Sequence, residues 1–121
     1  RRVIQTDLNP RFLMLAKHSY QLNQLTVSSA DFLAGDFFKV TQRFKNAGLL
    51  FDMVILDPPF FSQTSSGRVD LEQEYTRLVN KVRPLVGHEG RLIAINNALF
   101  ASGKEVLQQV NKLCETGYVQ L

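Results

Sequence analysis

The stretch FDMVILDPPFFSQTSSG, residues 51–67, decides the fold of this chain. Its continuous apolar run, Met53–Leu56, ends at Asp57 and is followed at once by two prolines and two phenylalanines. A short continuous apolar run is typical of an interior parallel strand that is covered on both faces. We therefore predict a buried strand over residues 51–57 with a carboxylate at its carboxyl end.

Strand and helix patterns alternate on either side of this strand. Apolar runs bounded by turn residues predict further strands over 3–7, 31–35 and 90–96, and another that begins within 116–121. Helical spacing of apolar residues, with capping residues at the ends, predicts helices within 8–25, 36–48, 71–85 and 102–116. The polar segment 62–68 is predicted to be a mobile loop that closes over a substrate.

This alternation predicts an α/β fold, with a doubly wound, mostly parallel, Rossmann-like sheet and helices on both faces. The length of 121 residues suits one domain at most. Because a strand pattern begins almost at the first residue and another begins at the last, we expect residues 1–121 to be an incomplete piece of a larger domain.

Composition narrows the class of protein. Hydrophobic residues make up 45% of the chain, enough for a core, and no apolar run approaches the ~20 residues of a membrane span. The net charge of +3 comes from basic residues scattered along the sequence, which favours an ordinary soluble surface. The single cysteine, Cys114, excludes an internal disulfide and fits a reducing, cytoplasmic setting. No set of metal ligands is predicted.

Ligands of parallel α/β sheets bind at the carboxyl ends of the strands, and acids or amides stand at four of these ends. Asp7 follows the first predicted strand, and its two oxygens suit the two hydroxyls of a ribose. Leu8 is predicted to pack on an adenine face. A nicotinamide dinucleotide would need the same acid, so Asp7 alone does not distinguish the cofactors.

Asp36 follows the second predicted strand and is expected to cap the next helix. It is also predicted to accept a hydrogen bond from the adenine amino group, with Phe37 against the ring. The Gly-rich turn of a nucleotide site would precede Val3, so this segment does not contain it.

Asp57-Pro58-Pro59-Phe60 is predicted to clamp a flat ring. The prolines fix two φ angles and remove two amide donors, which leaves Asp57 and the Pro58 carbonyl as a rigid pair of acceptors. Either Phe60 or Phe61 would stack on the ring, a contact that any base accepts. We expect one of the two phenylalanines to be buried and the other to be functional.

The motif at residues 57–60 and the segments before it resemble a known family. The sequence DPPF after a buried strand looks like the [Asp/Asn]-Pro-Pro-aromatic motif of class I S-adenosylmethionine-dependent methyltransferases that modify nucleobases or planar amides. Residues 5–25 resemble the second strand and helix of that fold, and 31–40 resemble its third strand and adenine turn. The resemblance implies a segment from the second strand to the start of the sixth, without the first strand and its Gly-rich motif.

Within this family, DPPFFS and INNALF (95–100) are most similar to bacterial large-subunit (23S) ribosomal RNA methyltransferases. One branch methylates cytosine C5 with a cysteine after the fifth strand, and another methylates guanine N7 and has paired asparagines there. This chain has Asn96 and Asn97. Cys114 falls on the inner face of a late helix, where a free cysteine usually acts as a small hydrophobe. Guanine N7 or an exocyclic amine is therefore favoured, because cytosine C5 needs covalent activation.

The resemblance implies methyl transfer from S-adenosylmethionine to a nucleobase in RNA, with ribosomal RNA as the expected substrate. Its implied catalytic residues are Asp57, Pro58, Pro59, Phe60, Asn96 and Asn97. Its implied cofactor-binding residues are Asp7, Leu8, Asp36, Phe37 and Asp57. The alternatives are methylation of DNA adenine or a protein amide, a nicotinamide-dependent oxidoreductase, and a non-catalytic module with the same fold. We expect the isolated segment to be inactive.

Overall fold

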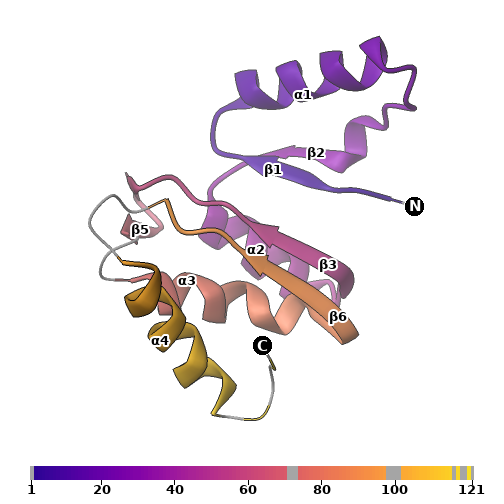
Figure 1. Cartoon of the computed structure of the whole chain (residues 1–121). Helices are drawn as coiled ribbons and strands as arrows, with labels where there is room; N and C mark the ends of the chain where they lie inside the picture. The colour runs from indigo at the N-terminus through magenta and orange to yellow at the C-terminus, as the bar shows by residue number, and fades with distance from the viewer. Residues whose placement is uncertain (1, 71–73, 98–101, 116, 118–119, 121) are drawn as a thin grey trace.

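The computed structural model describes residues 2–70, 74–97, 102–115, 117 and 120. Strands and helices alternate along most of the chain (Figure 1). In chain order they are β1 (Gln5–Asp7), α1 (Pro10–Leu22), η1 (Ser29–Asp31), β2 (Phe32–Ala34), α2 (Phe37–Asn46), β3 (Phe51–Leu56), β4 (Phe61–Thr64), β5 (Gly67–Asp70), α3 (Tyr75–Val82), η2 (Arg83–Leu85), β6 (Val86–Ala94) and α4 (Gly103–Cys114).

Two pairs of parallel strands form the framework. β1 pairs with β2, and β3 pairs with β6 so that Leu56 lies opposite Ala94. Each pair is extended by one hydrogen bond at its carboxyl end, where the Gly35 N–H donates to the Asp7 carbonyl and the Ile95 N–H to the Leu56 carbonyl, both at 2.9 Å. These bonds align the ends of paired strands, and the residues that follow therefore share one edge. The parallel α/β architecture is as predicted.

The core lies beneath the β3–β6 pair, against α3 and α4 (Figure 1). Tyr75 and Leu78 on α3 are 1% and 0% exposed, and spacing of three and four residues puts Val79 and Val82 on the same face. This face packs with Leu56 of β3 and other apolar residues: Val69, Leu113, Val54, Leu92 and Ala94. The carboxyl end of β3, which carries Asp57, is thus held by a packed core.

The opposite face of the β3–β6 pair differs from the prediction. Met53, Ile55 and Ile93 are 47%, 63% and 43% exposed, because successive side chains of a strand point to opposite faces and only one face meets α3 and α4. The expectation that both faces of this strand are covered is therefore wrong for the described residues. A continuous apolar run reports two apolar faces, but not what covers each of them.

The prediction of a mobile polar loop over residues 62–68 is also wrong. Most of 62–68 lies in an antiparallel hairpin, in which Ser62 of β4 faces the buried Val69 of β5. The turn between the strands is closed by a hydrogen bond from the Ser66 N–H to the Thr64 hydroxyl oxygen, at 3.2 Å. A four-residue strand with polar side chains offers too little alternation to be recognised from the sequence.

Helix ends follow the predicted capping residues, whereas the start of β6 differs from the prediction. The Asn9 side chain accepts from the Arg11 N–H at 3.0 Å with Pro10 first in α1, and Asp36 caps α2. β6 begins at Val86 rather than Gly90, because Pro84 ends the helical segment within η2. Leu71 and most of the strand predicted at 116–121 lie outside the described residues. None of the helices described here is both long and apolar enough to span a membrane.

Candidate functional site

A cleft of about 820 Å³ lies between the β1–β2 pair and the β3–β6 pair. Its walls come from β1, β3, the start of α2 and the β4–β5 hairpin. The volume is within the range of sites for small molecules and cofactors. Because the carboxyl ends of β1 and β3 both border it, the cleft brings together residues that are distant in the sequence.

The cleft collects most of the residues predicted from the sequence. All five predicted cofactor-binding residues line it, namely Asp7, Leu8, Asp36, Phe37 and Asp57. Of the predicted catalytic residues, Asp57, Pro58, Pro59 and Asn97 line it, whereas Phe60 and Asn96 do not. The placement puts the two predicted groups in one continuous space.

Asp7 stands at the end of β1 with part of its carboxylate already engaged. Its Oδ1 accepts from the Asn9 N–H at 2.7 Å, which fixes the side chain at the start of α1. This leaves Oδ2 and the remaining lone pairs of Oδ1 available to a ligand. Leu8 beside it is 56% exposed at the cleft wall, as an apolar contact for a ring requires.

The Asp36 carboxylate accepts hydrogen bonds from three donors. Its Oδ1 accepts from the Phe38 and Lys39 N–H groups at 2.9 and 3.2 Å, and its Oδ2 accepts from the Thr64 hydroxyl in the hairpin. Partial burial by itself raises the pKa of Asp36, but these hydrogen bonds outweigh it and hold the pKa below its ordinary value of 3.8. The predicted cap is confirmed, and Oδ2 keeps one lone pair that an adenine amino group could use.

The Thr64→Val variant is expected to lower the free energy of unfolding by on the order of 1 kcal/mol at neutral pH, since Asp36 loses one donor. The lowered pKa contributes stability that is present above 3.8 and is lost as the pH falls through the lower folded pKa. The difference between variant and wild type should therefore shrink below that pH. Urea unfolding at neutral and acid pH measures this, with Thr26→Val, an exposed loop residue, as the control. A difference that persists unchanged in acid would contradict it.

The tips of β3 and β6 meet through a side-chain hydrogen bond. Asn97 Nδ2 donates to Asp57 Oδ1 at 2.9 Å, which joins residues 40 positions apart in the chain. Asp57 and Asn97 are both exposed, while Asn96 is half-buried. The resemblance named both asparagines together with Asp57, and of the two it is Asn97 that contacts Asp57.

The two phenylalanines of the clamp differ from the prediction. Phe60 and Phe61 are 42% and 55% exposed, so the expectation that one of them is buried is wrong. Within this turn the buried residue is Pro58. Phe61, the first residue of β4, lines the cleft and Phe60 does not, so Phe61 is the better placed to stack on a ring.

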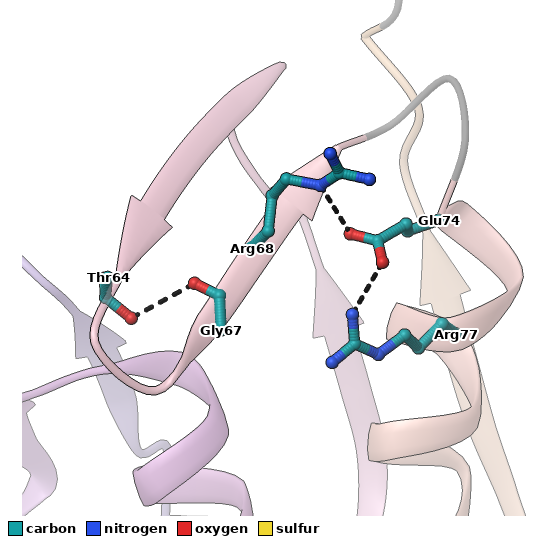
Figure 2. A network of polar contacts seen from close by, with 5 residues as sticks. All are labelled: Thr64, Gly67, Arg68, Glu74 and Arg77. Atoms are coloured by element: carbon teal, nitrogen blue, oxygen red, sulfur yellow. Dashed lines mark hydrogen bonds and ion pairs between the residues drawn. The ribbon is translucent and has the colours of Figure 1, made fainter.

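The hairpin is anchored to α3 by charged groups as well as to Asp36 by Thr64. Figure 2 shows Glu74 between two arginines, with Arg77 Nη1 at 2.6 Å and Arg68 Nε at 3.2 Å from its oxygens. Hydrogen bonds from Arg77 and then Arg68 hold the pKa of Glu74 below its ordinary value. The hairpin is thereby tied to Asp36 through Thr64 and to Glu74 through Arg68, a role for Thr64 and Glu74 that no motif in the sequence signals.

Among the described residues, the cleft has neither a cluster of metal ligands nor a cysteine thiol. No group of three or more His, Cys, Asp or Glu side chains there is arranged to hold a metal ion. Cys114 is half-buried at the end of α4 and does not line the cleft. The described cleft thus offers carboxylates, an amide, prolines and apolar rings, which suit binding and alignment.

A family model described as S-adenosylmethionine-dependent methyltransferase matches residues 1–115. Among curated proteins, the chain is 31% identical over 96 residues to ribosomal RNA large subunit methyltransferase I of Tolumonas auensis, covering 79% of this chain and 24% of that protein. It is 36% identical over 66 residues to the protein of the same name from Cronobacter sakazakii, covering 54% and 17%. The chain therefore spans a quarter or less of the length of these relatives.

Solved structures show the same fold. SMU.776, crystallised in complex with SAH, superposes with a TM-score of 0.82 at 22% identity, over 92% of this chain and 29% of that one. A SAM-dependent methyltransferase from Agrobacterium tumefaciens superposes with a TM-score of 0.81 at 19% identity, over 93% and 37%. The predicted Rossmann-like α/β class is confirmed by these likenesses.

Proposed function

The chain belongs to the S-adenosylmethionine-dependent methyltransferase family, and from this premise we propose that it forms part of a catalytic domain that methylates a nucleobase of ribosomal RNA. Family membership confirms the resemblance drawn from DPPF and favours methyl transfer over the nicotinamide-dependent alternative. The ribosomal RNA substrate is supported by relatives named as ribosomal RNA large subunit methyltransferases.

The residues of the cleft fit the proposed cofactor. Asp7 has carboxylate lone pairs free for a ribose, and Leu8 offers an apolar surface for the adenine. When bound, S-adenosylmethionine supplies a methyl group on a positively charged sulfur, which a lone pair of a nitrogen atom can attack. The carboxylates at the ends of β1 and β3, Asp7 and Asp57, place negative charge around such a cation.

The observation that carries the target-base proposal is the Asp57–Asn97 hydrogen bond at the cleft wall. Held by Asn97 and followed by Pro58 and Pro59, the Asp57 carboxylate can accept from a ring donor while Phe61 stacks on the ring. Guanine N7 presents a lone pair and loses no proton on methylation, so alignment suffices. An exocyclic amine loses a proton, for which Asp57 offers an acceptor.

Cytosine C5 remains disfavoured on chemical grounds. This carbon is a weak nucleophile and needs a thiolate to form a covalent bond to the ring first. Cys114, the last residue of α4, does not line the cleft. Methylation of guanine N7 requires only positioning by the described residues, and methylation of an exocyclic amine requires in addition the proton acceptor that Asp57 offers.

The test is transfer of a labelled methyl group from S-adenosylmethionine by the full-length protein to purified ribosomal RNA, DNA and protein. We expect label in ribosomal RNA only. Digestion to nucleosides, followed by mass spectrometry, then distinguishes 7-methylguanosine and exocyclic methylamines from 5-methylcytidine. Label in DNA or in protein would replace the RNA substrate with one of the alternatives, and 5-methylcytidine would overturn the nitrogen target.

A further inference from the structure

A groove of about 770 Å³ between α2 and α3 gathers positive charge that lies dispersed in the sequence. Lys39 and Arg43 come from α2, and Arg77 and Lys81 come from α3, each pair four residues apart on its helix. The other lining residues are neutral: Phe38, Gln42, Asn46, Ala47 and Ser66. No acidic side chain among the described residues lines this groove.

Three of these cations form no ion pair in the part of the chain that the structure describes, although the Asp36 carboxylate still attracts Lys39. Lys39, Arg43 and Lys81 take part in none of its ion pairs. Like charges four residues apart on a helix repel each other by a few tenths of a kcal/mol, and here both walls of one groove have such a pair. An arrangement of this kind is relieved by a negatively charged partner from outside.

Arg77 adds a cation that is already oriented. It donates to Glu74 and lies 5.3 Å from the centre of the Phe38 ring, and it is still 48% exposed. Its guanidinium has five N–H donors, and the ion pair with Glu74 uses Nη1 alone. Arg77 therefore has donors left for an anion in the groove.

The groove adjoins the cleft. The Phe38 ring lines both of them, and the turn of the hairpin lies directly on this ring. The approach is so close that a Cβ on Gly67 would lie 2.5 Å from Phe38 Cε2. Ser66 of the same turn lines the groove, and Thr64 lines the cleft. A ligand that follows the hairpin turn passes from one site to the other.

We propose that this groove binds the phosphate backbone of the RNA strand whose base occupies the cleft, an inference that rests on the proposed function. Four cations in two rows suit a chain of spaced phosphates better than a single small anion. The Gln42 and Asn46 amides and the Ser66 hydroxyl add neutral donors, which commonly contact phosphate and sugar oxygens. Backbone contacts of this kind position a strand without reading its sequence.

The test uses the full-length protein and a short fluorescein-labelled RNA hairpin of mixed sequence, with binding followed by anisotropy at several salt concentrations. The Arg43→Gln/Lys81→Gln variant removes one cation from each wall and keeps good helix formers. We expect about 10-fold weaker binding, and a slope of log affinity against log salt that is smaller by about 1 to 2. Affinity for S-adenosylmethionine should not change, because neither residue lines the cleft.

The matched control is Lys104→Gln/Lys112→Gln, which removes two exposed charges from α4. It should bind the RNA as the wild type does. If the groove variant and the wild type had the same affinity and the same salt slope, the proposed RNA binding by the groove would be wrong, while the proposed function would stand. Equal losses of RNA affinity in the groove variant and the control variant would also contradict binding by the groove, because they would reflect the change in net charge alone. A wild-type protein that neither binds nor methylates RNA would overturn both proposals.

Discussion

The Asp57→Ala variant is expected to methylate ribosomal RNA about 100-fold more slowly than the wild type at saturating S-adenosylmethionine, since small misplacements of a reacting group have effects of this size. The substitution removes the acceptor at the tip of β3 and leaves Asn97 Nδ2 without its described partner. Single-turnover transfer of labelled methyl groups measures the effect on the chemical step, apart from product release.

Two further variants make this result specific. Asp57→Asn retains an oxygen that can accept from Asn97 but no carboxylate that can take up a proton, so we expect a rate within about 10-fold of wild type for a guanine N7 target and a loss as large as that of Asp57→Ala for an exocyclic amine. Asp52→Ala removes an exposed carboxylate from the same strand outside the cleft, and should leave the rate unchanged. If Asp57→Ala retained the wild-type rate, the clamp would have to be assigned to other residues.

The Asp7→Ala variant is expected to bind S-adenosylmethionine roughly 100-fold more weakly, because two hydrogen bonds to a charged acceptor contribute about 3 kcal/mol or more. Isothermal calorimetry on the full-length protein measures this directly. The same substitution also removes the acceptor for the Asn9 N–H, which could disturb the start of α1.

Asp7→Asn separates these two effects. Its amide oxygen can still accept from the Asn9 N–H, while its amide nitrogen replaces an oxygen that the ribose would use. We expect Asn at this position to lose most of the cofactor affinity with little change in stability. Asp31→Ala, which breaks an ion pair with Arg2 outside the cleft, is the control and should bind normally. Full affinity in both Asp7 variants would show that the ribose is held elsewhere.

The framework of the fold could be predicted because it depends on local patterns. The apolar run Met53–Leu56 indicates a strand, and the helical spacing of Tyr75, Leu78 and Val82 indicates the buried face of a helix, each within one element. Asn9 and Asp36 cap their helices through contacts with residues two or three positions away. Such features do not require knowledge of which elements meet.

The remaining features depend on contacts between distant segments. Asn97 rather than Asn96 contacts Asp57, and this depends on the path of the chain after β6 separates from β3. A shift of one residue along this path would exchange the two asparagines. Phe61 rather than Phe60 lines the cleft because the chain enters β4 at that residue. Lys39 and Lys81 line one groove only because α2 and α3 pack beside each other. These outcomes follow from register and packing, which residue patterns do not encode.

The Asp36 carboxylate is shared by the helix cap and the hairpin, and this sharing has a thermodynamic consequence. Oδ2 accepts one hydrogen bond from Thr64 and keeps a second lone pair, so a bound cofactor would share this carboxylate with the hairpin that borders both the cleft and the groove. By linkage, the factor by which a bound cofactor changes the affinity for RNA equals the factor by which RNA changes the affinity for the cofactor. The two substrates of one reaction would then be coupled in binding through a single side chain.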